Sequence, residues 1–388
     1  MRRLKCLLFP SLAAALLVAA SITRAQNASS LADHELEEAG DQSDNPGPLA
    51  ANLSPALDRA TILKTMRLVA DWQLKRAKAY GSIGWTYATL YDGFLAASDA
   101  TGEKRYRDRV AQVAAQNHWS LGPRFAHADD EAIGFAYLTL YAQSHSSERL
   151  APTLAGMDKL IARPDDPDNN LWWWCDALYM APPVLAQLSV ATGDRRYLDF
   201  MDREWWLTSA ALYDPAEHLY FRDKSYLKSH EANGQKLFWS RGNGWVLASL
   251  ALVLERMPKH FPHRGRYLRQ YREMAERIAS VQQSDGLWRS GLLDPAAYPL
   301  PEVSGSAFYT FAMAWGIRYG VLDRAKYLPV VSKAWAGMLT HIYADGRLGS
   351  IQPIGGAPDK FKPSSSYVFG VGAFLLAGAQ LAEIVPKR

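Results

Sequence analysis

The stretch that decides the fold is Val246-Leu247-Ala248-Ser249-Leu250-Ala251-Leu252-Val253-Leu254, which carries no charged side chain. A second run of this kind, Gly370-Val371-Gly372-Ala373-Phe374-Leu375-Leu376-Ala377, lies near the C-terminus. Both belong to segments of helical length. A helix that is apolar on every side must be buried on every side. The two runs therefore predict helices inside the protein, surrounded by other helices.

Apolar segments of this kind alternate with more polar ones along the chain. The apolar set is predicted at 85–99, 129–143, 175–191, 241–255, 304–319 and 367–384. The polar set is predicted at 58–79, 103–117, 151–162, 195–209, 265–282 and 324–339. Six inner helices alternating with six outer ones indicate an all-α fold, an (α/α)6 toroid, in a single domain over residues 57–388.

Two features mark the connections between these helices. Residues 100–108 (ATGEKRYRD) recur as residues 191–199 (ATGDRRYLD), with looser copies at 263–268 and 322–328. The repeat predicts one turn type used several times, with a helix ending at glycine in each clear copy. Residues 211–239 do not fit the helical alternation. There Leu219-Tyr220-Phe221 and Lys236-Leu237-Phe238-Trp239 predict a small β-hairpin over the mouth of the toroid.

The N-terminus has the pattern of a signal peptide. A basic start is followed by an apolar run over 7–22 and by Thr23-Arg24-Ala25, which favours cleavage after Ala25. An uncleaved membrane anchor is the alternative, but Pro10 interrupts the run and the run is short. Residues 1–25 are thus predicted to direct export to the periplasm or the medium. Residues 26–56 are polar, acidic and poor in aromatics, which predicts a disordered leader.

Charge and cysteine content limit the possible partners. The chain carries a net charge of +4, and four cations without any acid lie in residues 1–25, so the mature protein has 4 − 4 = 0. A protein with this balance has no net positive charge that would attract nucleic acid, or a membrane after signal cleavage. Cys175 is the one cysteine left, which excludes an intramolecular disulfide. Nothing in the sequence indicates a protein partner, and we expect a monomer.

Unusual polar and aromatic residues gather where the apolar helices begin. They include His127-Ala128-Asp129-Asp130, Trp172-Trp173-Trp174-Cys175-Asp176, Trp239-Ser240-Arg241-Gly242-Asn243-Gly244-Trp245, Glu302-Val303-Ser304-Gly305-Ser306 and Ser364-Ser365-Ser366-Tyr367. If the inner helices are parallel, these segments converge at one end of the toroid. Positive helix ends with unpaired N–H groups around a cavity favour an anionic ligand.

Three of these segments contain candidate catalytic groups. A capping role accounts for one of Asp129 and Asp130 and leaves the other carboxylate for chemistry. Asp176 stands in an aromatic run, where burial raises the pKa of a carboxyl and suits it to donate a proton. Arg241, next to Gly242, is a candidate for anion recognition.

The remaining candidates have an ordinary structural explanation beside the functional one. Trp174 and Trp245 fit packing as well as sugar binding, and His127 draws interest chiefly from the two aspartates beside it. The acidic loop 165–170 lacks calcium-ligand spacing. We find no zinc spacing, no phosphate-binding glycine loop and no nucleophile elbow, so no metal or cofactor is predicted.

At these same residues the sequence resembles the unsaturated rhamnogalacturonyl hydrolases of glycoside hydrolase family 105. It is also similar to the related unsaturated glucuronyl hydrolases of family 88. The matching segments are 127–134, 174–183, 239–245, 285–288, 302–306 and 370–378, within a resemblance that covers residues 58–384.

The resemblance implies an (α/α)6 catalytic domain and a hydrolase of 4,5-unsaturated uronic acids at the non-reducing end of pectin-like oligosaccharides. It implies that Asp176 protonates C4 of the double bond and then activates a water that adds at C5. Asp129 or Asp130 would be the second family aspartate, without a metal. His127, Trp174, Arg222, Trp239, Arg241 and Trp245 are the expected substrate-binding residues.

One segment departs from the family. Where many members carry His-Gly in the hairpin, this chain has Tyr220-Phe221-Arg222-Asp223, so Arg222 takes a different part in binding. Two alternatives stay open from the residues alone. One is a hydrolase of saturated uronides that uses two carboxylates directly. The other is a non-catalytic carbohydrate-binding protein with an aromatic-lined cup.

Overall fold

The computed structural model describes residues 39–77, 81–166 and 169–386. The predicted signal peptide and residues 26–38 of the predicted leader lie outside the described residues. The account below concerns the unit that begins at Gly40.

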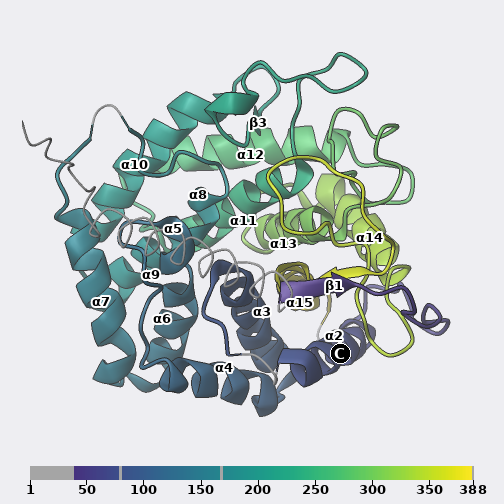
Figure 1. The fold of residues 1–388 in the computed structure, drawn as a ribbon, viewed down its shortest axis with the longest axis horizontal. Coiled ribbons are helices and arrows are strands. Elements are labelled where there is room, and N and C mark those ends of the chain that lie inside the picture. The colour runs from purple at the N-terminus through teal and green to yellow at the C-terminus, as the bar shows by residue number, and fades with distance from the viewer. Residues whose placement is uncertain (1–38, 78–80, 167–168, 387–388) are drawn as a thin grey trace, which may run out of the picture. The chain divides into compact units, whose positions relative to one another are not determined.

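Six long helices of the described chain form an inner ring. They are α3 (Trp85–Thr101), α6 (Ile133–Ser144), α9 (Pro182–Thr192), α11 (Ser240–Arg256), α13 (Val303–Arg318) and α15 (Val368–Ile384). Each packs against the next in chain order, and α15 closes the ring against α3 (Figure 1). Every residue of α11 from Ser240 to Leu254 is buried, as is every residue of α13 from Val303 to Ile317. The all-round apolar runs thus form the interior, as predicted.

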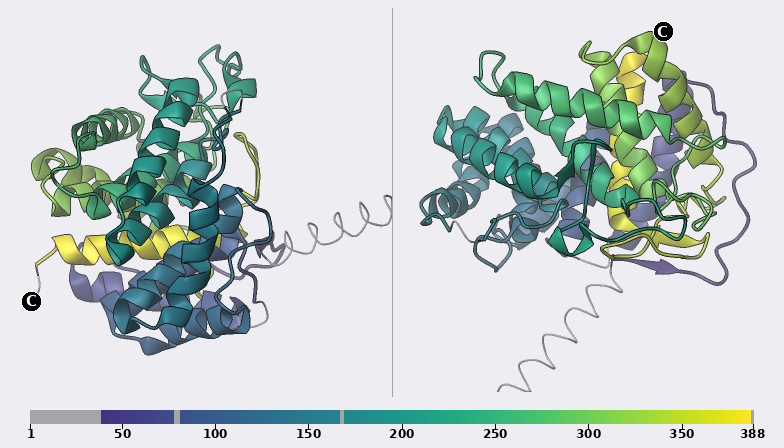
Figure 2. Two further views of the ribbon diagram at one scale, coloured as in Figure 1. Left: turned by 90° about the vertical axis from the view of Figure 1, so that its left-hand side faces the viewer. Right: turned by 90° about the horizontal axis from the view of Figure 1, so that it is seen from above.

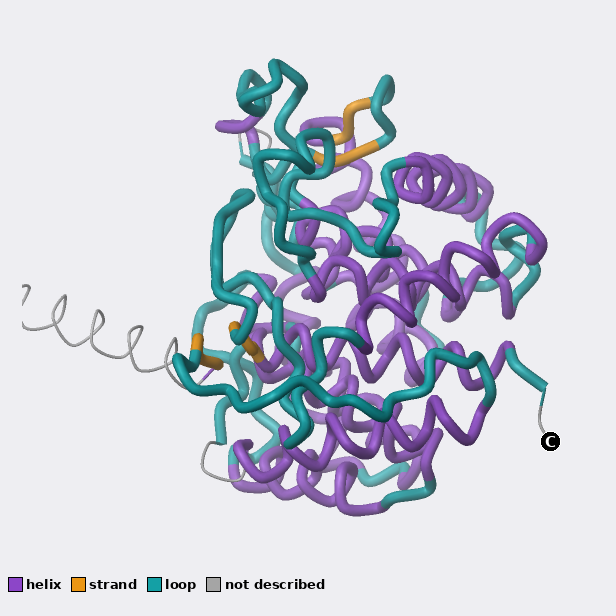
Figure 3. Tube along the Cα trace, turned by 90° about the vertical axis from the view of Figure 1, so that its right-hand side faces the viewer, coloured by secondary structure: helices purple, strands orange, loops and turns teal. Residues whose placement is uncertain are grey.

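The more polar helices surround this ring. They are α2 (Arg59–Ala77), α4 (Lys104–Gln116), α7 (Ser147–Ile161), α10 (Arg196–Leu212), α12 (Arg264–Ser280) and α14 (Arg324–Leu339). Helices make up most of the described chain, with long loops and few short strands (Figure 3). The predicted (α/α)6 toroid is confirmed. Among the described helices, none combines the length and the apolar character that a membrane-spanning segment needs.

Small residues allow the inner helices to approach closely. A Cβ on Gly93 of α3 would lie 2.5 Å from the carbonyl oxygen of Gly372 in α15. A Cβ on Gly372 would lie 2.2 Å from the carbonyl oxygen of Thr89. At these distances any side chain would force the two helices apart, so glycine is required at both positions.

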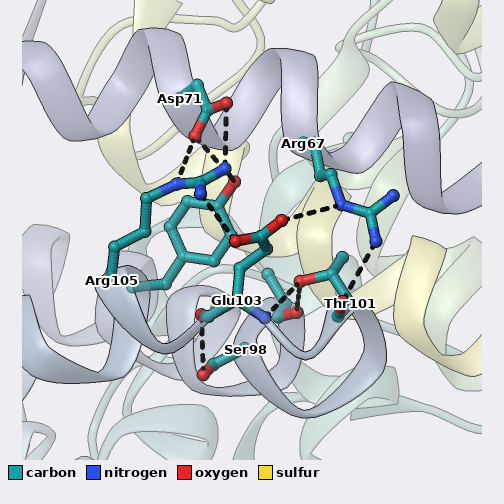
Figure 4. A network of polar contacts seen from close by, with 8 residues as sticks. Arg67, Asp71, Ser98, Thr101, Glu103 and Arg105 are labelled. Carbon is teal, nitrogen blue, oxygen red and sulfur yellow. Dashed lines mark hydrogen bonds and ion pairs between the residues drawn. The ribbon is translucent and has the colours of Figure 1, made fainter.

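The repeated turn ends its helices as predicted. Gly102 and Gly193 cap α3 and α9 in the left-handed conformation, with φ of 77° and 74°. Polar contacts attach the first turn to α2 (Figure 4). Arg105 donates from Nε to Asp71 Oδ1 over 2.9 Å and from Nη1 to Glu103 Oε2 over 2.6 Å. The turn thereby fixes the outer helix α4 beside α2.

The hairpin within 211–239 is present, but its strands differ from the prediction. β2 (Tyr213–Asp214) pairs with β3 (Leu219–Tyr220), and 236–239 forms only isolated bridges, to His230 and Gly291. The reason is local. The Asp214 carboxylate accepts two backbone N–H groups of the turn that follows it, which closes a tight hairpin directly after α10.

The prediction of a disordered leader over 26–56 is wrong for its C-terminal part. β1 (Gly40–Gln42) pairs antiparallel with β4 (Ser365–Tyr367). Asp41 forms ion pairs with Arg347, at 2.6 Å, and with Arg76. A polar segment can be ordered in this way because backbone hydrogen bonds and ion pairs attach it, which composition alone does not reveal. β1 and the loop before β4 lie toward the same end of the ring (Figure 2).

Candidate active site

A cavity of about 250 Å³ opens where the inner helices begin. It is lined by residues from the starts of α3 and α11, from the segments before α6 and α9, and from the loop before β4. These residues are Trp85, Asp129, Trp174, Asp176, Met180, Arg222, Trp239, Arg241, Trp245, Ile354 and Gly355. Three of the five segments that the sequence placed at helix N-termini, 127–130, 172–176 and 239–245, therefore meet at this cavity. Residues of 302–306 and 364–367 are not among those that line it.

Asp176 is the most deeply placed acid of this cavity. It precedes the short helix α8 (Ala177–Met180) and is 8 % exposed. The Cys175 thiol donates to Asp176 Oδ2 over 3.7 Å. Burial raises the pKa of Asp176, while the positive charges of Arg222 and Arg241 lower it in part. The carboxyl is thus shifted toward its protonated form inside a cavity, as a proton donor requires.

The chain places Arg222 beside Asp176 through backbone pairing. The Cys175 N–H donates to the Arg222 carbonyl over 2.8 Å, and Trp174 bridges to Asp223. Arg222 Nε lies 3.7 Å from Asp176 Oδ2, and Arg222 Nη1 donates to Asp223 Oδ2 over 2.7 Å. The guanidinium stacks 5.3 Å above the ring of Trp173. Asp223 and Trp173 together fix the orientation of this arginine.

The two neighbouring aspartates have different surroundings. Asp130 is bonded to the guanidinium of Arg124, and its carbonyl accepts the Gly122 N–H over 2.8 Å. Asp129 lines the cavity, with Oδ2 3.8 Å from Arg124 Nη2. Burial raises the pKa of Asp129 to about 6, and the negative charge of Asp176 adds to this shift. The geometry therefore assigns Asp129 to the cavity and Asp130 to the turn beneath it.

His127 stands at the edge of this group. It caps α5 (Ala128–Glu131), and its ring centroid lies 5.2 Å from that of Trp174. Its Nδ1 lies 3.8 Å from Asp129 Oδ2. Burial and the charge of Arg124 lower the pKa of His127 below its ordinary value. The imidazole is therefore a neutral group at neutral pH, next to the cavity rather than among its lining residues.

The terminal nitrogens of Arg241 are already used in hydrogen bonds within the protein. Its side chain has no exposed surface, and its two terminal nitrogens donate to the carbonyl oxygens of Gln352 and Pro353, each over 2.7 Å. The guanidinium lies 4.5 Å from the ring centroid of Trp239 and 4.8 Å from that of Phe369. Burial lowers the pKa of Arg241 to about 10, so it remains a cation at neutral pH. This buried cation holds the loop that contributes Ile354 and Gly355.

Gln352 connects that loop to the ring. Its Oε1 accepts the indole N–H of Trp239 over 2.8 Å and the hydroxyl of Ser290 over 2.9 Å. Its Nε2 donates to the Ala357 carbonyl over 2.7 Å. Its backbone N–H donates over 3.1 Å to Glu302, whose carboxylate also caps α13. With each polar group of Gln352 bonded, the loop over residues 352–357 is fixed before any ligand arrives.

Aromatic rings form the remaining wall. Trp245 lies 4.7 Å from Tyr179, 4.2 Å from Phe308 and 6.0 Å from Trp85, measured between ring centroids. Its side chain is 1 % exposed, so most of its surface is used in packing. Trp173, outside the cavity, is 50 % exposed and packs against Trp174. Such rings offer flat apolar faces to a sugar and exclude water.

Sequence reasoning missed four lining residues. Trp85 begins the first inner helix, and the rule that polar and aromatic residues gather at helix starts would have found it. Met180, Ile354 and Gly355 carry no such signal. The last two belong to a loop whose position depends on hydrogen bonds with residues far away in the sequence.

Comparison with known proteins agrees with this geometry. Residues 60–385 match Glycosyl Hydrolase Family 88. A relative from Formosa agariphila, named unsaturated 3S-rhamnoglycuronyl hydrolase, is 38 % identical over 84 % of this chain and 92 % of its own. A family 88 structure from Bacteroides vulgatus has a TM-score of 0.79 and 29 % identity, over 84 % of this chain and 100 % of that one. A family 105 structure from C. acetobutylicum has a TM-score of 0.70 and 21 % identity, over 81 % and 98 %.

The fold and the cavity define a six-hairpin glycosidase. The chain belongs to glycosyl hydrolase family 88. The predicted resemblance to families 88 and 105 is confirmed.

Proposed function

We propose that the protein releases a 4,5-unsaturated uronic acid from the non-reducing end of oligosaccharides produced by polysaccharide lyases. The observation that carries this proposal is Asp176, a buried carboxyl with a raised pKa in the cavity and 3.7 Å from Arg222. A cavity that contains a proton donor and a cation suits an anionic terminal sugar. The family membership and the name of the Formosa relative support the same reaction.

The chemistry follows from the structure of such a substrate. Lyase action leaves a C4=C5 double bond that is a vinyl ether with the ring oxygen and is conjugated with the carboxylate. Protonated Asp176 gives its proton to C4, and the resulting cation is stabilised by the ring oxygen. Asp176, now a carboxylate, takes a proton from the water that adds to C5. The hemiketal then opens to a ketone at C5, and C1 releases the next sugar as an alcohol.

Asp129 is the second carboxylate in this proposal. It lines the cavity, and its pKa of about 6 leaves it mostly ionised at neutral pH. A negative charge facing Asp176 favours the protonated form of Asp176. Asp129 thus keeps the acid ready while it accepts a hydrogen bond from the substrate or the attacking water. Asp130, bonded to Arg124, supports this arrangement from outside the cavity.

The sugar on the reducing side is the finer part of the proposal. The Formosa relative is named for an unsaturated rhamnoglycuronyl substrate, which supports rhamnose next to the unsaturated uronate here. Pectin-type rhamnogalacturonan fragments meet this description. The half-exposed Trp173 offers a face for this second sugar outside the cavity.

The test is an ultraviolet assay of the mature protein. Unsaturated disaccharides that end in rhamnose, and others that end in a hexosamine, are supplied separately, with saturated uronides alongside. The conjugated double bond absorbs in the ultraviolet and loses this absorbance when hydrated. We expect loss of absorbance together with sugar release, fastest for the rhamnose-linked substrate. Release of sugar from saturated uronides alone would refute the proposal.

We further propose that the protein is exported and cleaved after Ala25. The basic start and the apolar run over 7–22 support this. N-terminal sequencing of the protein from the expressing bacterium, fractionated into cytoplasm, periplasm and medium, tests it. Mature protein that begins at Gln26 outside the cytoplasm is expected, and an intact Met1 in the cytoplasm would contradict export.

A further inference from the structure

Two arginines line the cavity, and they differ in what they can still bind. Arg241 has no exposed surface, both of its terminal nitrogens donate to carbonyls, and two aromatic rings lie against its guanidinium. A substrate carboxylate could reach it only after the loop over 352–357 had moved. Arg241 therefore acts on a ligand through its charge and through the loop.

Arg222 is more exposed than Arg241 and makes fewer side-chain hydrogen bonds among the described residues. Its side chain is 25 % exposed, whereas Arg241 has no exposed surface. The Nε of each arginine is buried without a hydrogen-bond partner among the described residues. The one side-chain hydrogen bond of Arg222 among the described residues runs from Nη1 to Asp223 Oδ2 over 2.7 Å, while its Nε lies 3.7 Å from Asp176 Oδ2. Gly356 of the loop leaves room beside it, because a Cβ there would lie 3.3 Å from Arg222 Nε. An oriented guanidinium with an unpartnered Nε edge in a cavity is prepared for an anion.

We propose that Arg222, through the edge that carries Nε, binds the carboxylate of the unsaturated uronate. This inference rests on the proposed function and names the group that recognises its substrate. The side-on pairing of a carboxylate with Nε and a terminal nitrogen is a common arginine geometry and fixes both distance and orientation.

The position of Arg222 explains why recognition and chemistry coincide. The carboxylate carbon of the substrate is bonded to C5, and C5 is bonded to C4. Because Arg222 Nε lies 3.7 Å from Asp176 Oδ2, a carboxylate on this arginine brings C4 and C5 beside the acid. The bound carboxylate also offsets the positive charge of Arg222, which otherwise favours the ionised form of Asp176. Substrate binding thereby helps Asp176 keep its proton until C4 receives it.

The experiment compares the unsaturated disaccharide with its methyl ester, which retains the double bond but lacks the charge. Wild-type enzyme should lose about 100-fold in kcat/KM on esterification, since a charge-assisted pair is lost. Arg222→Met should lose about 100-fold on the acid but less than about threefold on the ester. Arg222→Lys, which keeps the charge without the fork, should fall between them on the acid.

Arg241→Met is the matched control because it removes the other arginine of the same cavity. It should reduce kcat/KM on acid and ester alike, so that the ratio of the two stays near the wild-type value. Thermal unfolding of each variant shows whether it folds, and Arg222→Lys carries the test if Arg222→Met does not.

The outcomes separate this inference from the proposed function. Equal losses of Arg222→Met on acid and ester, with wild type active, would overturn the role of Arg222 and leave the proposed function standing. A lost acid preference in Arg241→Met alone would also overturn it and transfer the role to Arg241. A wild type inactive on every unsaturated substrate would instead refute the proposed function.

Discussion

The two ends of the inner ring both contain a buried aspartate, an arginine and a cavity. At the end where the inner helices begin, Asp176 and Arg241 border about 250 Å³. At the opposite end, Asp92 and Arg256 border about 440 Å³. Burial raises the pKa of both aspartates. Neither the volume of a cavity nor an aspartate with a raised pKa therefore identifies the active end.

The direction of the helices distinguishes the two ends. Their N–H groups face the smaller cavity, which favours an anionic sugar, and their carbonyl groups face the larger one. Carboxylates of Asp99, Glu255 and Glu383 also surround the larger cavity, where they repel an anion. The smaller cavity has aromatic walls and an arginine edge that still lacks a partner. The direction of the helices and the presence of unpaired hydrogen-bond donors therefore identify the active end better than cavity volume does.

The largest expected effect is that of Asp176→Asn. An amide cannot give a proton to C4 or take one from water, so kcat on an unsaturated disaccharide should fall by at least about 10³-fold. Initial rates of absorbance loss measure this, and binding of the disaccharide by calorimetry should persist. A variant with more than a tenth of the wild-type rate would remove Asp176 from the mechanism.

Next comes Arg241→Met, which tests whether the active end depends on its fixed loop. Two buried carbonyls lose their donors, and the loop over 352–357 loosens, so kcat/KM should fall about 100-fold. Hydrogen exchange in this loop should increase, and the free energy of unfolding should drop by about 2–4 kcal/mol. Unchanged exchange in the loop would contradict the positioning role.

Asp129→Asn should have a smaller effect, about 10-fold on kcat/KM, because the proton donor remains. The variant also removes a negative charge that faces Asp176. Asp129 itself, Arg222, Asp223, Arg241 and Cys175 are the charged and titratable groups around Asp176. Loss of a like charge lowers the pKa of Asp176, so the fall in activity at high pH should begin about one unit lower. A pH profile of kcat/KM measures this shift.

Asp130→Asn provides the control for that variant. Its carboxylate bonds Arg124 outside the cavity, so the substitution should lower thermal stability more than activity. If Asp130→Asn shifted the pH profile and Asp129→Asn did not, the two aspartates would exchange roles.

The smallest effect is expected at the opposite end, for Asp92→Asn. Activity should stay within about twofold of wild type, because this cavity takes no part in the reaction. Since burial raises the folded-state pKa of Asp92 above the unfolded value, ionisation opposes folding as pH rises past the unfolded pKa. The variant should therefore gain stability, by about 2–4 °C in Tm at pH 7 and less at pH 4. Lower Tm at pH 7 would contradict this.

The fold was predictable because its signal is repeated. The buried helices carry apolar runs such as 246–254, and a more polar segment of helical length lies between one buried helix and the next. The same order predicted which helix starts converge, and Asp176 with them. Residues 40–42 were not predictable as a strand, because their pairing partner lies more than 300 residues away.

The site was predictable in composition but not in its contacts. Nothing in the pair Asp129-Asp130 tells which carboxylate faces the cavity, since the choice depends on Arg124. Arg241 fits anion recognition by sequence, yet its donors are used by Gln352 and Pro353, which are distant along the chain. Hydrogen bonds of this kind are tertiary properties that a local sequence pattern does not contain.

The most direct test of the central claim is to follow the reaction in heavy water by NMR. If Asp176 protonates C4, the product should contain one solvent deuterium at C4, on one face, and its appearance should match the release of the neighbouring sugar. Asp176→Asn should show neither event. Release of that sugar together with a uronate that still has its C4=C5 bond would contradict the account.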